Sequence, residues 1–222
     1  DQLNRVDAVA TEARKRVARQ YRDIAGDVAD RSKAAAAVDQ SIMAQIVSEV
    51  AGVPALQAVP TRVLDRIVDR AIIDGAPSSE WWRRQAGDVA ARFHDELRQG
   101  VQAGESAGDL IKRVRGTPGK QYADGIMRIP QSNAEALVRS SQLSILHDTR
   151  MAEFRQNADV VEGWAILATF DDRTCPICMG LSGAAFDLDG NPLDGSPFGS
   201  RLTSDGLPLH FSCRCVAVPV LH

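Results

Sequence analysis

All four cysteines of this 222-residue chain lie in its last fifty residues, together with a histidine. They form two groups. Cys175 and Cys178 make a Cys-x2-Cys pair, and after a gap of 31 residues come His210, Cys213 and Cys215. Thiolate and imidazole are the ligands that zinc prefers, and a Cys-x2-Cys pair places two sulfurs on one side of a tight turn. If the two groups are in contact, the chain between them must fold back on itself. This cluster therefore restricts the possible C-terminal folds more than any other feature of the sequence.

Five candidate ligands compete for the four positions of a tetrahedral zinc site. Side chains two residues apart in an extended chain point to opposite faces, so Cys213 and Cys215 are not expected to bind one ion together unless a turn intervenes. The predicted ligands are therefore Cys175, Cys178, His210 and one of these two cysteines, and the predicted cofactor is a structural Zn²⁺. Two other interpretations stay open: the cysteines are small buried apolar residues, or they oxidise in pairs.

Other features of the sequence favour a reducing compartment. No apolar run approaches the roughly 20 residues that span a bilayer. The first four residues lack the basic start and apolar stretch of a secretory signal. In a reducing cytosol, clustered cysteines indicate metal binding more than disulfides. We therefore expect no membrane partner.

The distribution of charge argues against nucleic-acid binding by the cysteine region. The net charge of the chain is −3, and residues 160–222 hold three arginines against seven acidic residues. A zinc module that grips phosphates needs lysines and arginines around its cluster. This region is acidic instead.

The first ~157 residues show helical periodicity. Apolar residues recur at spacings of three and four over residues 3–28, and then at Val38, Ile42, Ile46 and Val50. This pattern predicts two successive amphipathic helices, and the near-heptad spacing of the first also suits packing against a partner chain. Four further helices are predicted: over residues 61–72, from residue 78 or 79 to 104, from 106 through 114, and from a capping box at Ser132 and Glu135 to about 156.

After Asp159 the pattern changes to β, with a strand over residues 160–170 and shorter strands at 185–188 and 216–220. A Gly- and Pro-containing loop is expected over residues 189–207. The predicted fold class is α+β: a predominantly helical N-terminal part and a small C-terminal β-containing domain that the cysteines and histidine hold together. The expected divisions are 1–77 (a helical assembly or extension segment), 78–159 (helical) and 160–222 (small and β-rich).

Several motifs of familiar enzymes are incomplete or absent in this sequence. Nucleobase deaminases pair Pro-Cys-x2-Cys with a His-x-Glu that carries the proton shuttle. His94-Asp95-Glu96 has that spacing and His147 does not start it, but the proline of this chain, Pro176, lies inside the cysteine pair rather than before it. His-Glu-x2-His and the phosphate-binding loop are absent. Asp171 and Asp172 precede the cysteine pair, where aspartates more often form turns or caps than act as acids or bases. We therefore expect no enzyme.

The residues around the cluster resemble the phage Mu F-like head morphogenesis family. The resemblance lies in the strand residues 163–168, in Asp172-Arg173-Thr174-Cys175-Pro176-Ile177-Cys178, in Leu181-Ser182-Gly183, in Phe186 and in His210-Phe211-Ser212-Cys213-Arg214-Cys215. Phe211 stands where the family usually has proline. The resemblance extends upstream, more loosely, to about residue 78, and residues 1–77 are not covered.

This resemblance implies a minor capsid protein of a tailed bacteriophage, associated with the portal vertex and acting in head assembly or in DNA packaging and delivery. The implied location is the virion, inside the capsid, after assembly in the host cytoplasm. The implied partners are the portal protein and the major capsid or scaffold proteins, with self-association and contact with packaged DNA as further expectations. The alternative is a metal-dependent hydrolase or nuclease that uses the cluster with Asp171 and Asp172.

Overall fold

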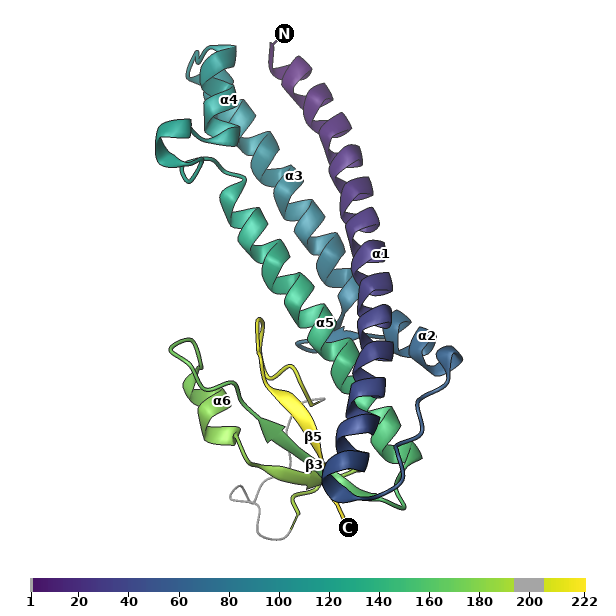
Figure 1. Ribbon diagram of the computed structural model, residues 1–222. Coiled ribbons are helices and arrows are strands. Elements are labelled where there is room, and N and C mark those ends of the chain that lie inside the picture. Colours follow the sequence, from purple (N-terminus) through teal and green to yellow (C-terminus); the bar gives the residue numbers. More distant parts are fainter. Residues whose placement is uncertain (1, 194–205) are drawn as a thin grey trace. The chain divides into compact units, whose positions relative to one another are not determined.

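The computed structural model describes residues 2–193 and 206–222 (Figure 1). The described chain forms two compact units. Unit 1 comprises residues up to Asp27 and Ser79–Val138, and unit 2 comprises Val28–Ser78 and Arg139–His222. Helices α1 (Gln2–Ala51) and α5 (Arg128–Gln156) contribute residues to both units. The predicted divisions at residues 77 and 159 stay predictions.

Helix α1 is continuous, so the prediction of two successive helices in this part of the chain was wrong. The residues that join the two predicted stretches, 29–37, contain four consecutive alanines and neither glycine nor proline. Alanine has the highest helix propensity, so the chain has no local reason to leave the helix here.

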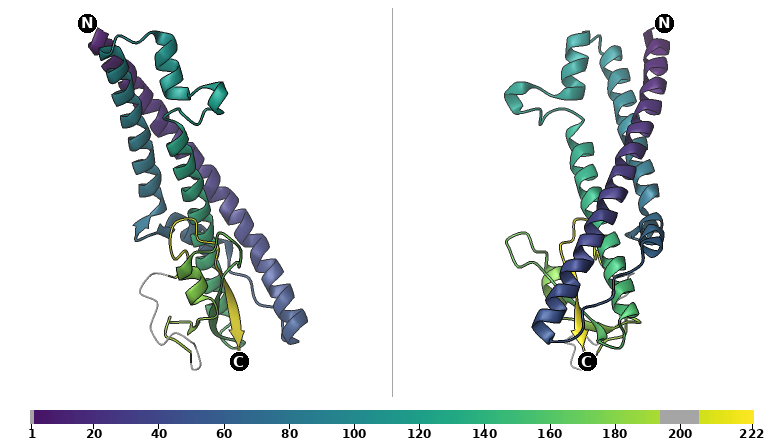
Figure 2. Two further views of the ribbon diagram at one scale, coloured as in Figure 1. Left: turned by 90° about the vertical axis from the view of Figure 1, so that its left-hand side faces the viewer. Right: turned by 45° about the vertical axis from the view of Figure 1, so that its right-hand side comes forward.

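In unit 1, α3 (Ser78–Gln102) runs alongside the first half of α1, as Figures 1 and 2 show from three directions. The two helices meet through aromatic residues, since buried Trp82 lies with its ring centroid 6.2 Å from that of Tyr21. Helix α4 (Ala107–Arg115) begins as predicted, with the Ser106 hydroxyl accepting a hydrogen bond from the amide of Asp109 at 3.3 Å. A short 3₁₀ helix, η1 (Pro118–Lys120), follows.

The capping box predicted at Ser132 and Glu135 was wrong, because α5 already begins at Arg128. Pro130 therefore lies in the first turn of α5, where a missing backbone N–H costs nothing because that group has no partner within the helix. The predicted end of this helix near Gln156 is confirmed.

Unit 2 contains α2 (Thr61–Asp69), which ends earlier than predicted because a two-stranded hairpin follows it. Strands β1 (Ile72–Ile73) and β2 (Ala76–Pro77) are joined by Asp74 and Gly75, whose φ angles are 48° and 73°. Two successive positive φ values are typical of the tight turn that Asp-Gly favours. The Asp-Gly dipeptide was therefore the signal for this hairpin.

The second sheet of unit 2 has three antiparallel strands in the order β4-β3-β5: β4 (Ala185–Asp187), β3 (Val161–Leu167) and β5 (Val216–Leu221). Trp164 of β3 is in register with Phe186 of β4 on one side and Pro219 of β5 on the other. The three predicted strands are thereby confirmed within a few residues, and so is the α+β fold class. A short helix that the sequence analysis missed, α6 (Pro176–Leu181), lies between β3 and β4.

The apolar core of unit 2 is shared by the sheet and the helices. Buried Trp164 and Phe186 of the sheet belong to one cluster with Met43 of α1, Phe154 of α5 and three of the four cysteines. An ion pair joins the same elements: Arg150 of α5 holds both carboxylate oxygens of Asp39 of α1, each at 2.7 Å, and donates to the carbonyl of Ala217 of β5 at 2.6 Å.

The predicted loop over residues 189–207 lies mostly outside the described residues, which end at 193 and resume at 206. Before the gap, Pro192 forms an isolated bridge to Phe186. No helix among the described residues has the length and apolarity that crossing a bilayer demands.

Candidate metal centre

The first half of the cluster is built by the start of α6. Cys175 is the residue that caps this helix, and its Sγ accepts a hydrogen bond from the amide of Cys178 at 3.3 Å. Pro176 occupies the first turn, where its fixed φ suits a helix start. Both sulfurs consequently lie at the beginning of α6, as the Cys-x2-Cys spacing predicted.

A turn before the helix fixes the approach of the chain. One carboxylate oxygen of Asp171 accepts from the amide of Arg173 at 2.9 Å, and the amide of Asp171 donates to the hydroxyl of Thr174 at 3.0 Å. The same carboxylate forms a two-pronged ion pair with Arg214, at 2.5 and 2.6 Å. Hydrogen bonds from Arg214 hold the pKa of Asp171 far below its usual range. Asp171 thus acts as a turn former, as predicted, and also joins the two halves of the cluster.

The second half is a turn that precedes β5. The amide of Cys213 donates to the carbonyl of His210 at 3.1 Å, and Ser212 adopts a left-handed φ of 61°. The amide of Ser212 donates to the hydroxyl of Ser140 on α5 at 2.9 Å. His210 Nδ1 lies 2.7 Å from the carbonyl of Phe211, a contact that assigns the ring proton to Nδ1 and leaves Nε2 free to bind a metal ion.

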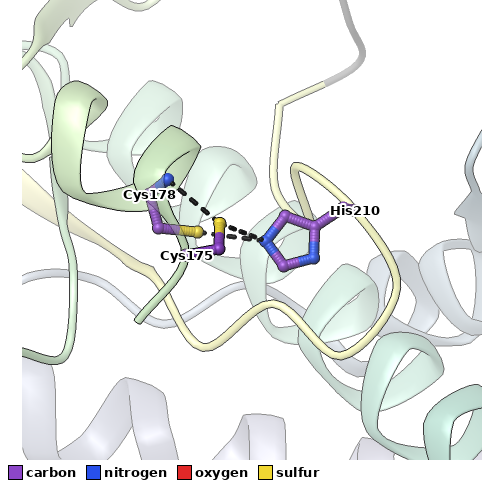
Figure 3. A group of neighbouring side chains, drawn as sticks. All are labelled: Cys175, Cys178 and His210. Carbon is purple, nitrogen blue, oxygen red and sulfur yellow. Dashed lines mark hydrogen bonds between the residues drawn. The ribbon is translucent and has the colours of Figure 1, made fainter. Parts of the chain in front are cut away.

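The two halves meet (Figure 3). His210 Nε2 lies 3.2 Å from Cys175 Sγ and 3.1 Å from Cys178 Sγ. Cys178 Sγ lies 3.8 Å from Cys213 Sγ. Four ligands placed about 2.0–2.3 Å from a tetrahedral zinc are roughly 3.3–3.8 Å from one another. The residues of the cluster therefore fit a zinc ion.

Cys215 also reaches the cluster. Its Sγ and those of Cys178 and Cys213 all lie within 4.8 Å of one another, as do the ligand atoms of Cys175, Cys178 and His210. The turn at residues 210–213 brings Cys213 and Cys215 to the same side, which is the exception that the sequence analysis allowed. The 3.8 Å between Cys178 Sγ and Cys213 Sγ favours Cys213 as the fourth ligand, with Cys215 beside it.

The pKa values of the Cys213 and Cys215 thiols are shifted in opposite directions. A hydrogen bond from Cys215 lowers the pKa of the Cys213 thiol to about 5, whereas that contact with Cys213, together with burial, raises the pKa of Cys215. Burial also raises the pKa of Cys178 to about 12. A cation lowers the pKa of a thiol that it binds, so a metal ion would offset the cost of burying several sulfurs together.

The two other interpretations of the cysteines fit this geometry less well. All four are free thiols, and the 3.8 Å between Cys178 Sγ and Cys213 Sγ is far from the roughly 2.05 Å of a disulfide. Cys178, Cys213 and Cys215 are buried, yet their sulfurs lie within 4.8 Å of one another, and that of Cys178 lies 3.1 Å from His210 Nε2. Residues that only fill a core have no reason to converge in this way.

The recess beside the cluster is small. Its volume is about 20 Å³, and among its lining residues are Arg173, Thr174, Cys175 and His210. A space of this size holds about one water molecule. It has no room for a nucleotide or a peptide.

Two buried polar side chains of α5 were given no role in the sequence analysis. Neither carboxylate oxygen of Glu153 has a hydrogen-bond partner among the described residues, and burial raises its pKa to about 7. His147 is buried against Trp164, with 5.1 Å between ring centroids, and burial lowers its pKa to about 4. Apolar periodicity gives no signal for either, because the buried face of α5 is itself largely polar here: Ser140, Ser141, Ser144 and Thr149 are buried too.

The fold and the site define a class of protein: a largely helical chain with a small antiparallel sheet and a cysteine-histidine cluster that could hold a metal ion. The family described as Phage Mu protein F like protein matches residues 91–218, which is more than half of the chain, and the chain belongs to this family. The matched segment includes all five residues of the cluster. Comparisons with curated proteins and with solved structures gave no match.

Proposed function

We propose that the protein is a minor capsid protein that acts in head morphogenesis of a tailed bacteriophage. Membership of the Phage Mu protein F like family supports this proposal most directly. In this proposal the protein binds the portal protein, or the major capsid or scaffold proteins, at the portal vertex and stays inside the capsid after assembly in the host cytoplasm. Contact with packaged DNA during packaging or delivery is part of the same proposal.

The cluster supports a structural role rather than a catalytic one. A structural zinc site is closed by four protein ligands, whereas a catalytic zinc keeps one position open for water or substrate. Here Cys175, Cys178 and His210 lie at ligand–ligand separations and Cys213 Sγ lies 3.8 Å from Cys178 Sγ, beside a recess of about 20 Å³. The nearby carboxylate of Asp171 is engaged by Arg214 through both oxygens. We therefore propose that the protein is not an enzyme and that Zn²⁺ stabilises its C-terminal region.

Co-purification tests this function. Portal, scaffold and major capsid proteins of the same phage are expressed with the tagged chain, and DNA-free proheads are isolated. We expect the chain to sediment with proheads and to be captured with the portal protein alone. Absence of the chain from proheads, or cleavage of DNA by the zinc-loaded protein but not by its Cys178→Ser variant, would contradict the proposal.

A further inference from the structure

Helix α1 carries an apolar stripe that the rest of unit 2 does not cover. Val38, Ile42, Ile46 and Val50 are exposed by 59%, 51%, 49% and 83%. Their i, i+4 spacing is one that usually marks the buried side of a helix. In unit 2 that buried side is instead formed by Ser32, Ala36, Gln40, Met43 and Val47.

The exposed stripe carries no charge of its own. Between Lys33 and Glu49 the only charged residue is Asp39, and its carboxylate is bound by Arg150 within unit 2. The four side chains together present roughly a few hundred Å² of apolar surface, the size at which an exposed patch marks an interaction site. A face without charges fits a partner face that also lacks charges.

We propose that this stripe is a docking surface for a second copy of the chain, with the two α1 helices antiparallel. The proposal does not depend on the proposed function. A second copy offers a face of the same uncharged chemistry, and a two-fold axis at the level of residue 40 makes the face complementary to itself. Val38 of each copy then packs against Ile42 of the other.

The neighbouring positions support this register. Ala34 and Ala35, both exposed, face Ile46 and Gln45 of the second copy, so small side chains lie opposite large ones. Arg31 and Glu49 lie at the two ends of the stripe, on the same side of the helix as Ile42 at about 100° per residue, and are both exposed. In the antiparallel register each arginine therefore meets the glutamate of the other copy, whereas a parallel pair would bring like charges together.

The stripe is smaller than the roughly 800 Å² per partner of a stable complex, so the dimer is expected to be reversible, with a dissociation constant on the order of 10 μM. Sedimentation equilibrium of the purified chain over a range of concentrations measures this constant. Ile42→Glu places a charge in the centre of the stripe and is expected to weaken the dimer by at least about tenfold, because it buries an unpaired carboxylate.

Ala37→Glu is the matched control. Ala37 is exposed on the same helix but lies about 140° around it from Ile42, so this variant is expected to dimerise like the unchanged chain. Circular dichroism shows whether both variants keep their helices. A chain that stays monomeric at about 100 μM, ten times the expected constant, overturns the proposal, as does an equal effect of the two substitutions. Protection of the stripe only in assembled particles, with a monomeric purified chain, means that another virion protein covers it and also overturns the proposal.

A photo-crosslinking residue at position 50 tests the orientation. Val50 is the most exposed member of the stripe. In the antiparallel register it lies opposite the region around residue 30 of the second copy, so mass spectrometry should find the crosslink there. A crosslink to the region around residue 50 shows a parallel pair, and one outside α1 shows a different interface. Either result overturns the proposed arrangement.

Discussion

At the scale of single residues, Cys213 and Cys215 are assigned different roles: Cys213 is the proposed metal ligand, and Cys215 lies beside it. Both sulfurs lie near Cys178, but Cys213 approaches it to 3.8 Å, a separation expected of two ligands of one zinc ion. Cys215 is almost completely buried beside it. A residue next to a ligand tunes the metal site, whereas a ligand holds the ion, so the two cysteines should differ in what their loss costs.

We predict that Cys213→Ser abolishes stoichiometric zinc and that Cys215→Ser keeps it. The unchanged chain should hold about one zinc per molecule, and Cys215→Ser should weaken binding by roughly 10–100-fold, as is usual for a residue that supports a ligand. Zinc content after dialysis, measured by elemental analysis, and competition with a chromogenic chelator give both quantities. Equal loss of zinc in the two variants would show that our choice of the fourth ligand is wrong.

Glu153 makes a second residue-scale prediction, because its carboxyl group is buried without a hydrogen-bond partner among the described residues. Burial raises its pKa from 4.5 to about 7. The folded state therefore binds more protons than the unfolded state between these values, so the stability contributed by Glu153 falls as the pH rises through that window. Glu153→Gln should stabilise the protein above pH ~7.5 by up to about 3 kcal/mol and change little near pH 5.

Urea unfolding of Glu153→Gln and of the unchanged chain at several pH values measures this difference. Glu162→Gln serves as the control, since Glu162 is an exposed carboxylate on β3. If Glu153→Gln stabilises the protein equally at every pH, the raised pKa of Glu153 is not the cause. The gain would then come from packing of the neutral amide, which does not change with pH.

At the scale of elements, two ion pairs of α1 differ in burial. Asp39 and Arg150 are 21% and 14% exposed and join α1 to α5 and β5, whereas Lys33 pairs with Asp65 of α2 at 34% and 52% exposure. Removing one partner of a buried pair leaves an uncompensated charge, while an exposed pair contributes little.

Asp39→Ala should therefore destabilise the protein by about 2–4 kcal/mol, and Asp65→Ala by less than about 1 kcal/mol. Chemical denaturation of both variants under the same conditions compares them directly. If the two substitutions cost the same, the Arg150 pair is not the connection between these elements that the contacts indicate.

Replacing either of two glycines with alanine is expected to change the stability in opposite directions. Gly26 lies exposed within α1, and a Cβ there would contact nothing within 4 Å. Gly26→Ala should stabilise the protein by about 0.5–1 kcal/mol, because alanine restricts the unfolded chain and favours the helix. Gly75 has the same open surroundings but a φ of 73°. Gly75→Ala should destabilise by about 1 kcal/mol, since an L side chain strains that backbone. Thermal unfolding of each variant gives the sign, and a shared sign would contradict the argument.

These elements also show what the sequence can predict. The Cys-x2-Cys spacing predicted a common side for Cys175 and Cys178 because the geometry of a helix start is local. The stripe at Val38, Ile42, Ile46 and Val50 predicted a helix, but not which side of it is buried. That choice depends on Ala36, Met43 and Val47, which meet residues far away in the sequence. The pairing of Asp39 with Arg150 is non-local in the same way. The contact between the two halves of the cluster is also non-local, and it could be predicted only because zinc binds cysteine and histidine.

At the scale of the whole molecule, the cluster belongs to a core larger than the small β-rich region expected from the sequence. The core of unit 2 includes Met43 and Val47 of α1 and Phe154 of α5 together with Trp164, Phe186 and Cys178. A metal ion held between α6 and the turn before β5 would therefore stabilise helix ends as well as the sheet. The residues of unit 1 have separate contacts, among them Arg113 with Glu96 and Glu105.

We predict that removal of the metal by a chelator loosens unit 2 as a whole and leaves unit 1 folded. Metal binding is part of the folding free energy where ligands come from separate segments, so protection from hydrogen exchange should fall in residues 160–193 and 206–222 and also in the C-terminal parts of α1 and α5. Residues 79–115 should keep their protection. Hydrogen exchange read by mass spectrometry resolves these segments, and readdition of zinc should restore them. Loss confined to residues after 160 would show that the sheet folds separately from the helices, despite the core that they share.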